Sequence, residues 1–259
     1  MNGPSSSPDD AAGKPYWEGV WKNYIPERYP GPIFEHHDLY TRYLPRGTNL
    51  SVVEIGAMPG NNLVYFAKEF GYRVTAIDYC ADVSLIASTM ELNGIHDFSV
   101  INADVFTLRD GRTYDVVFSS GFAEHFDDYE EVLAMHARFV NVGGYLLITV
   151  PNTRFLHKLL MQAFCPAVLA IHRPYLMDRD VMRRGVERLG FDVLFCDYLK
   201  TFRLTYGLPG WLNLIPRIVN KALRVLRLDN IGNRFASPYL YLVARKRADP
   251  EQSVSKPSQ

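Results

Sequence analysis

From Leu50 onward, short β-rich runs alternate with helical periods, and this alternation limits the folds that the chain can adopt. The β-rich runs are LSVVEIG, YRVTAID, FSVINAD, YDVVFSSG, YLLITVPN, FDVLFCDYL and SPYLYLVARKR. Continuously apolar strands of this kind are typical of a parallel sheet with helices on both faces. We therefore predict an α/β fold with a doubly wound, seven-stranded, mostly parallel sheet. A long insert separates the last two strands, so the seventh can enter antiparallel.

The rest of the chain forms segments at both ends of the sheet domain and inserts within it. The 259 residues, 47% of them hydrophobic, suffice for one large domain with a buried core. We predict a disordered leader at 1–15, a single domain at 16–247 and a disordered tail at 248–259, because both ends are rich in Ser, Pro and charged residues. Inside the domain we expect an aromatic N-terminal lid at 16–46 and apolar helical inserts at 153–175 and 203–235.

Composition excludes several classes of protein. The 28 basic and 28 acidic residues cancel, so no global field recruits nucleic acid. Cys80, Cys165 and Cys196 are an odd number without CxxC spacing, which argues against a disulfide framework or a structural zinc site. No apolar signal segment begins the chain. These features favour a reducing compartment, and we predict a cytoplasmic protein.

Acidic residues gather where the first three predicted strands end. The first strand leads into the loop VVEIGAMPG, which contains Glu54 and Gly56. Asp78 ends the second strand, and Asp104 ends the third. In doubly wound sheets, ligands bind at the carboxyl ends of the strands, and a carboxylate at the position of Asp78 reaches the hydroxyls of a ribose. We therefore expect a nucleoside site at this edge.

The same loop argues against a phosphorylated ligand. A dinucleotide fingerprint reads GxGxxG, whereas here Met58 and Asn61 occupy the second and third glycine positions. No Lys or Arg lies between Val52 and Lys68 to offset the charge of Glu54. The site is suited to a nucleoside that has a cationic part and no phosphate.

Five motifs in this order resemble those of the class I S-adenosylmethionine-dependent methyltransferases, particularly the branch that methylates small molecules and glycans. They are VVEIGAMPG, YRVTAIDYC, NADVF, YDVVFSSGFAEHF and VNVGGYLLITVPN. The resemblance covers roughly Leu50 to Tyr198 and the last strand, and implies a Rossmann-like methyltransferase fold. Met58 departs from the family pattern, because it replaces the middle glycine of the first motif.

The resemblance also implies the cofactor, S-adenosylmethionine, and the residues that hold it. Those residues are Glu54, Gly56, Ala57, Gly60, Asp78, Tyr79, Asp104, Val105, Ser120 and Gly121. Asp78 is expected on the ribose, Tyr79, Asp104 and Val105 around the adenine, and the end of the fourth strand beside the methyl group.

Histidines are the candidates for acid–base chemistry. Transfer to an oxygen is helped by a base, and His125 follows the strand end that borders the methyl group. A role in packing the next helix is the alternative. We also expect His37 and His172 to contact the substrate, with His36 an alternative to His37. His96, His136 and His157 are expected on the surface. We expect no metal site, since carboxylate-rich ligand spacing is missing.

The second insert contains a basic amphipathic segment at 211–228. Arg217, Lys221, Arg224 and Arg227 recur at steps of four, three and three among apolar residues. Such a helix can lie on an anionic membrane or hold a phosphorylated lipid carrier. It can also be the solvated face of a helix packed on the domain. The sequence leaves these readings open, together with the oligomeric state.

The sequence thus predicts a methyltransferase that uses S-adenosylmethionine to methylate a hydroxyl of a small molecule or glycan. Two alternatives stay open: an enzyme acting on a lipid or quinone precursor, and a cofactor-binding subunit without catalysis. A nucleic-acid methyltransferase is disfavoured, because the chain has no Asn/Asp-Pro-Pro-aromatic motif for flipped bases and no net positive charge.

Overall fold

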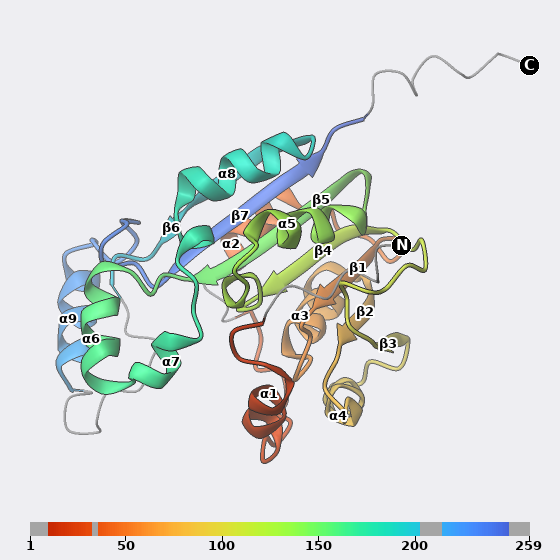
Figure 1. Ribbon diagram of the computed structural model, residues 1–259, viewed down its shortest axis with the longest axis horizontal. Helices are drawn as coiled ribbons and strands as arrows, with labels where there is room; N and C mark the ends of the chain where they lie inside the picture. Colours follow the sequence, from red (N-terminus) through yellow and green to blue (C-terminus); the bar gives the residue numbers. More distant parts are fainter. Residues whose placement is uncertain (1–9, 33–35, 203–213, 249–259) are drawn as a thin grey trace, which may run out of the picture.

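The computed structural model describes residues 10–32, 36–202 and 214–248, and a seven-stranded sheet forms its centre (Figure 1). The strands are β1 (Ser51–Ile55), β2 (Arg73–Asp78), β3 (Phe98–Asn102), β4 (Tyr114–Ser120), β5 (Val140–Pro151), β6 (Phe191–Leu199) and β7 (Tyr239–Lys246). Their order is β3-β2-β1-β4-β5-β7-β6, with β7 antiparallel to both neighbours and the pairs from β3 to β5 parallel. The predicted α/β fold is confirmed, including the antiparallel seventh strand.

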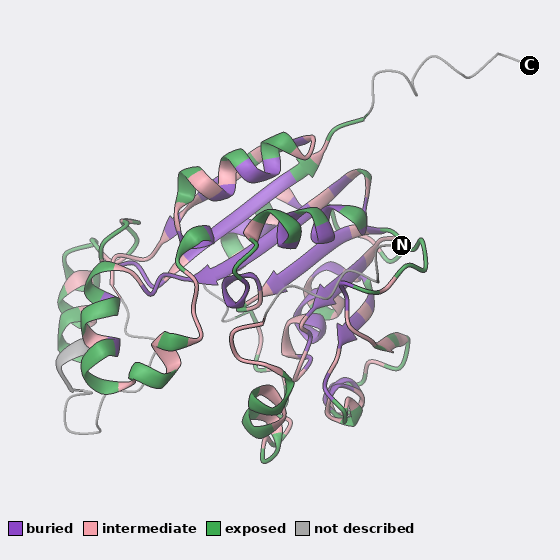
Figure 2. Cartoon of the chain, viewed as in Figure 1, coloured by how far each residue is buried: buried purple, intermediate pink, exposed green. Residues whose placement is uncertain are grey.

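Helices cover both faces of the sheet, which buries its strands as their apolar sequences require (Figures 1 and 2). The described helices are α1 (Lys14–Trp21), α2 (His37–Tyr43), α3 (Asn61–Phe70), α4 (Ser84–Leu92), α5 (Tyr129–Arg138), α6 (Phe155–Phe164), α7 (Pro166–Ala170), α8 (Arg179–Arg188) and α9 (Leu214–Val225), with 3₁₀ turns η1 (Ala123–His125) and η2 (Tyr175–Met177). Tyr40 and Phe66 belong to the core under α2, α3 and α4. Leu133 and Val186 belong to the core under α5 and α8.

The connections place a crevice at the carboxyl end of the sheet. After β1 the chain crosses over α3 to β2 on one side, whereas after β4 it crosses over α5 to β5 on the other. Because the two crossovers diverge, the loops after Ile55 and Ser120 separate. Such a point in a doubly wound sheet is where ligands bind.

The N-terminal segment divides into two parts, which differs from the predicted boundaries. Residues 10–15, assigned above to the leader, are in contact with the domain: Asp10 pairs with Phe126, and the amide of Ala11 donates to the carbonyl of His125 at 2.9 Å. By contrast, α2, assigned above to the lid, belongs to the core, because Tyr40 is fully buried. Asp10, together with Trp17 and Trp21 of α1, has the position expected of a lid, because these residues line the cavity described below.

Two local expectations are wrong. Asp127, with Glu130 three residues later, has the pattern of a capping box. The side chain that caps α5 is instead Asp128, whose carboxylate accepts the amide of Glu131 at 2.9 Å. His136 and His157 are buried rather than solvated. His136 donates through Nδ1 to the carbonyl of Val132 at 2.7 Å and accepts at Nε2 from the Ser119 hydroxyl at 2.9 Å. Both ring nitrogens of His136 therefore have hydrogen-bond partners inside the core. The position of His136 in the sequence does not reveal these partners.

Candidate functional site

A cavity opens at the carboxyl edge of the sheet, at the crevice between β1 and β4. We call it the edge cavity. It is lined by Asp10, Trp17, Trp21, Ile55, Gly56, Met58, Ile77, Asp78, Tyr79, Cys80, Ala103, Asp104, Val105, Phe106, Ser120, Gly121, Phe122, His125 and Phe126. Seven of the ten residues expected to hold the cofactor line it, namely Gly56, Asp78, Tyr79, Asp104, Val105, Ser120 and Gly121. His125 lines the same cavity.

Asp78 is fixed at the rim by the backbone. Its Oδ2 accepts the amide of Met58 at 3.0 Å, and its Oδ1 accepts the amide of Cys80 at 3.0 Å. The carboxylate therefore connects the end of β2 to the loop after β1. Its remaining lone pairs are available to accept hydrogen bonds from a ligand in the edge cavity.

The loop after β1 approaches the far wall of the cavity closely. Gly56 has a φ of +69°, and a Cβ atom there would lie 2.7 Å from Cδ2 of Phe122. Any other residue at this position would force the ring to move, so the loop requires glycine. Met58, the departure from the family pattern, lines the cavity.

Three residues expected at the cofactor, namely Glu54, Ala57 and Gly60, do not line the edge cavity. Gly60 precedes α3 and has a φ of +99°. Glu54 is buried, and its Oε1 accepts from Nδ2 of Asn62 at 2.7 Å. Its Oε2 has no hydrogen-bond partner among the described residues. Burial raises the pKa of the Glu54 carboxyl well above its ordinary value.

The charge of the edge cavity selects the kind of ligand it can hold. Among the described residues that line it are Asp10, Asp78 and Asp104, and neither Lys nor Arg. A phosphate placed among these carboxylates would be repelled, whereas a cation would be attracted. The aromatic walls add surfaces on which a base or a cation can stack. The donors therefore fit a cationic nucleoside such as S-adenosylmethionine.

The N-terminal segment closes one side of the edge cavity. The hydroxyl of Tyr79 donates to Oδ2 of Asp10 at 2.6 Å, and the amide of Ala81 donates to Oε1 of Glu18 at 3.1 Å. Trp17 contacts the ring of His125 edge-on, with the ring centroids 4.8 Å apart. Sequence reasoning missed Asp10, because it lies in a stretch whose composition is typical of disorder.

His125 is buried and held in one orientation. Its Nδ1 lies 2.9 Å from the carbonyl oxygen of Ile171, which can only accept, so Nδ1 carries the proton in the neutral ring. Nε2 is then the basic nitrogen, and it lies 3.6 Å from Oε1 of Glu124. Glu124 is buried, and burial raises the pKa of its carboxyl to about 6. The pair can accept a proton at Nε2 and stabilise the resulting cation.

His172 lies beside this pair, but His37 does not. The rings of His172 and His125 have centroids 5.0 Å apart. Nδ1 of His172 donates to the carbonyl of Val168 at 2.6 Å, and burial lowers the pKa of its imidazole to about 4. His37 is the first residue of α2, and its Nδ1 lies 3.1 Å from the Tyr65 hydroxyl. It lines neither the edge cavity nor the second cavity, which is described next.

A second cavity lies next to the edge cavity, and Ser120 lines both. The second cavity is lined by Glu27, Arg28, Tyr29, Pro30, His36, Asn61, Asn62, Val64, Asn93, Ser120, Thr149, Tyr239 and Tyr241. Amide, hydroxyl and aromatic groups predominate in it, which suits a hydroxyl-rich or ring-shaped molecule. It contains His36, which the sequence analysis named as the alternative to His37.

Glu124, His125 and His172 could together hold a metal ion, since one ligand atom from each lies within 4.8 Å of the others. A tetrahedral zinc shell places its ligand atoms only about 3.4 Å apart. The group would have to contract to bind zinc. The group was missed in the sequence because His172 lies 47 positions after His125 and 48 after Glu124.

Comparison with known proteins decides the family. The family model for a methyltransferase domain matches residues 27–194, which is more than half of the chain. The chain belongs to this methyltransferase family. Solved structures of S-adenosylmethionine-dependent methyltransferases share its fold.

Individual relatives of this methyltransferase are distant. Phosphoethanolamine N-methyltransferase 2 of Caenorhabditis elegans is 27% identical over 128 residues, which cover 47% of this chain and 28% of the relative. The chain therefore spans little more than a quarter of that relative. A methyltransferase structure from Archaeoglobus fulgidus has a TM-score of 0.52 and 22% identity, covering 81% of this chain and 92% of the other. The structure of Haemonchus contortus phosphoethanolamine N-methyltransferase 2 in complex with S-adenosyl-L-methionine has a TM-score of 0.57 and 18% identity. The match covers 90% of this chain and 56% of the other.

Proposed function

We propose that this methyltransferase moves a methyl group from S-adenosylmethionine to a hydroxyl of a small molecule or glycan. The observation that carries the proposal is the position of His125 in the wall of the edge cavity, with its basic nitrogen beside a buried carboxylate. An amine acceptor is nucleophilic once neutral, whereas a hydroxyl benefits from a base that removes its proton. A His–Glu pair at this place is therefore best explained by an oxygen acceptor.

We place the cofactor in the edge cavity. Asp78 would accept from the ribose hydroxyls, Asp104 and Tyr79 would flank the adenine, and Gly56 would border the amino-acid part. The sulfonium supplies a methyl group whose transfer to an oxygen removes a positive charge. The residues contribute alignment and exclusion of water, and Trp17 and Trp21 of α1 cover the cavity for that purpose.

The acceptor is expected to reach the reacting centre from the second cavity. Ser120 lines both cavities, so a molecule in the second would lie next to one in the edge cavity. The acceptor hydroxyl would give its proton to Nε2 of His125, and Glu124 would stabilise the imidazolium that forms. Glu124 acts through His125 and is a positioning residue. A cytoplasmic location belongs to the same proposal and is supported by three free thiols.

A panel of acceptors tests the proposal. The purified protein is incubated with S-adenosylmethionine carrying a deuterated methyl group and with matched hydroxyl and amine compounds, including free sugars, phenols and phosphoethanolamine. Mass spectrometry then locates the label. A labelled methyl ether supports the proposal, and label found only on nitrogen contradicts it. Tight cofactor binding without transfer to any member of the panel favours a non-catalytic subunit.

A further inference from the structure

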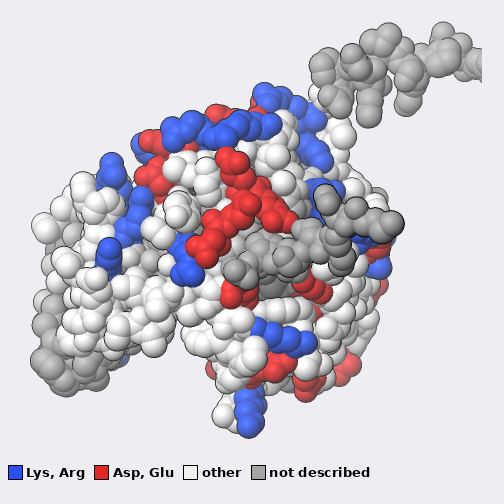
Figure 3. All heavy atoms as spheres, in the orientation of Figure 1, with Lys and Arg blue, Asp and Glu red and all other residues white. Residues whose placement is uncertain are grey.

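The two inserts form a lobe beside the main sheet. This insert lobe comprises residues 153–175 and 214–235, with α6, α7 and α9 (Figure 1). It contains eight Lys and Arg and one acid, Asp229, which leaves 20 basic and 27 acidic residues in the rest of the chain. In the face drawn in Figure 3, basic side chains lie among uncharged atoms on this lobe. A chain that is neutral overall therefore has a positive lobe and a negative body.

Helix α9 exposes its apolar side as well as its basic side. Arg217, Lys221 and Arg224 recur at helical spacing on one side, and all are exposed. Ile218 and Val225 share the neighbouring side and are 59% and 76% exposed. A helix that packs on its own domain buries the apolar side, so the explanation by simple packing does not hold for these residues.

The apolar exposure continues onto α6. Leu159 of α6 is 67% exposed, and Phe235, which follows α9, is 58% exposed. The two parts touch: the amide of Leu156 donates to the carbonyl of Phe235 at 3.3 Å, and the rings of Phe155 and Phe235 have centroids 5.1 Å apart. Figure 2 shows both helices largely exposed. An uncovered apolar surface of this kind marks an interaction site.

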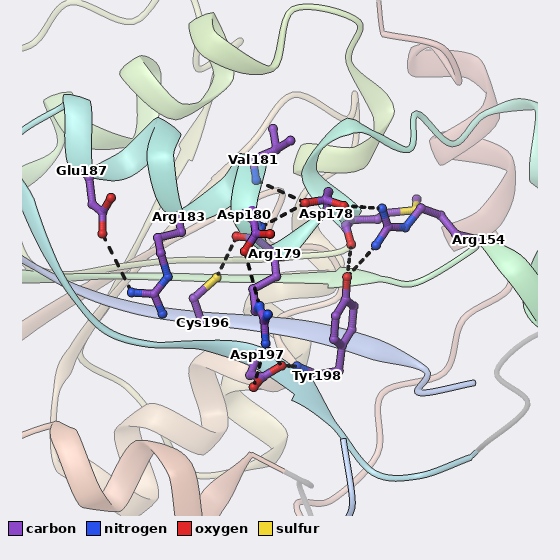
Figure 4. A network of polar contacts seen from close by, with 11 residues as sticks. Arg154, Asp178, Arg179, Asp180, Val181, Arg183, Glu187, Cys196, Asp197 and Tyr198 are labelled. Atoms are coloured by element: carbon purple, nitrogen blue, oxygen red, sulfur yellow. Dashed lines mark hydrogen bonds and ion pairs between the residues drawn. The ribbon is translucent and has the colours of Figure 1, made fainter. Parts of the chain in front are cut away.

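The lobe is fixed to the sheet where the first insert begins. Arg154 donates to Oδ2 of Asp178 at 2.9 Å and to the Tyr198 hydroxyl at 2.5 Å (Figure 4). The Tyr198 hydroxyl in turn donates to the carbonyl of Met177 at 2.8 Å. These contacts connect the insert to η2, the cap of α8 and β6. The exposed surface is therefore held at one place relative to the body.

We propose that the insert lobe binds the surface of an anionic phospholipid bilayer, with the apolar side chains of α9 and α6 in the interface and the basic ones among the headgroups. Helix α9, with 12 residues and a length of about 18 Å, has the apolar and basic sides of a helix that lies in a bilayer interface. Each helix in the described parts of the chain is too short or too polar to cross a bilayer. The negative body is repelled by the same surface, so the lobe faces the lipid.

Other occupants fit the charges less well. A second copy of the chain that bound through the same lobe would bring another basic lobe against this one, and the single acid of the lobe cannot balance it. Nucleic acid would pair with the basic residues but leave the apolar side chains in water. An anionic bilayer accommodates both sets of side chains at once.

Vesicle flotation tests the proposal, with the full-length protein and no substrate, so the outcome is independent of methyl transfer. Binding is compared on vesicles of phosphatidylcholine alone and of phosphatidylcholine mixed with phosphatidylglycerol. We expect binding only to the mixed vesicles. Lys221→Gln/Arg224→Gln should weaken it roughly fivefold for each charge removed. Ile218→Ser/Val225→Ser should weaken it about tenfold or more.

A charge-matched control is Arg184→Gln/Arg188→Gln on α8, which should bind as the wild type does. Circular dichroism melts check that each variant is folded. The proposal is overturned if the wild type ignores mixed vesicles, or if the α8 control loses binding as strongly as the α9 variants. It is also overturned if sedimentation velocity reveals a dimer that Ile218→Ser/Val225→Ser dissociates, since the apolar side would then bind a second copy.

Discussion

Asp78 should contribute to cofactor affinity as well as to the stability of the fold. Replacing it with Asn keeps the size of the side chain but removes the charge and turns one acceptor oxygen into a donor. The new amide nitrogen would face the amide of Met58 or of Cys80, each of which now donates to a carboxylate oxygen at 3.0 Å. One backbone donor is therefore left unpaired, and the loop after β1 loses a contact.

The expected magnitudes follow from these contacts. A hydrogen bond to a charged group contributes about 1.5–3 kcal/mol, so losing the one to the ribose should weaken S-adenosylmethionine binding roughly 10- to 150-fold. The unpaired backbone donor should cost about 1–3 kcal/mol of unfolding free energy. Isothermal titration calorimetry and urea unfolding measure the two effects separately.

Asp115→Asn is a matched control at the opposite end of the sheet. Oδ2 of Asp115 accepts both the amide and the hydroxyl of Ser51 at 2.8 Å, so its loss should destabilise the fold by a similar amount. It is remote from the edge cavity and should leave the Kd for S-adenosylmethionine unchanged. The placement of the ribose is refuted if Asp78→Asn binds the cofactor within twofold of the wild type, or if both variants weaken it equally.

Three further variants test other parts of the molecule. Gly56→Ala should lose roughly 1–3 kcal/mol of unfolding free energy, because its Cβ would lie 2.7 Å from Phe122 and φ is +69°; an unchanged urea midpoint would contradict this. Burial lowers the pKa of His136 to about 4, so the stability it contributes is present above pH 6.5 and is lost as the pH falls toward 4, by about 3 kcal/mol. His136→Gln should flatten that part of the pH dependence of urea unfolding, and an unaltered slope would exclude His136 as its source. Burial raises the pKa of the Glu124 carboxyl to about 6, so the rate of methyl transfer should rise through pH 6 as the carboxylate forms. Glu124→Gln should abolish this inflection in the pH–rate profile. An inflection that persists in the variant would belong to another group.

The sequence predicted the α/β sheet and the position of the edge cavity, because both depend on local patterns. Continuously apolar strands and the acids at their ends are readable without tertiary contacts, and Asp78 and Asp104 line the edge cavity. The pairing of Glu124 with His125 depends instead on a 3₁₀ turn, and the proximity of His172 depends on the path of the first insert. Periodicity carries no information on either.

Burial was the other quantity that the sequence did not provide. Sequence patterns assigned His136 to the surface and Asp10 to the leader, yet the His136 ring is hydrogen-bonded inside the core and the Asp10 carboxylate accepts from the Tyr79 hydroxyl. Conversely, α9 has the pattern of a packed amphipathic helix but exposes its apolar side. Each of these outcomes depends on partners that are distant in the sequence. The predictions for residues 1–9 of the leader, 33–35 of the lid, 203–213 of the second insert and 249–259 of the tail lie outside the described residues.

The most direct test of the account is the rate of methyl transfer by His125→Ala, measured in a single turnover with the acceptor identified by the panel and with the S-adenosylmethionine Kd determined on the same sample. A base that removes the acceptor proton contributes typically 10²–10⁴-fold, so the rate should fall at least about a hundredfold while the Kd stays within roughly threefold. A rate near that of the wild type, with the cofactor still bound, would show that the hydroxyl is not activated by His125.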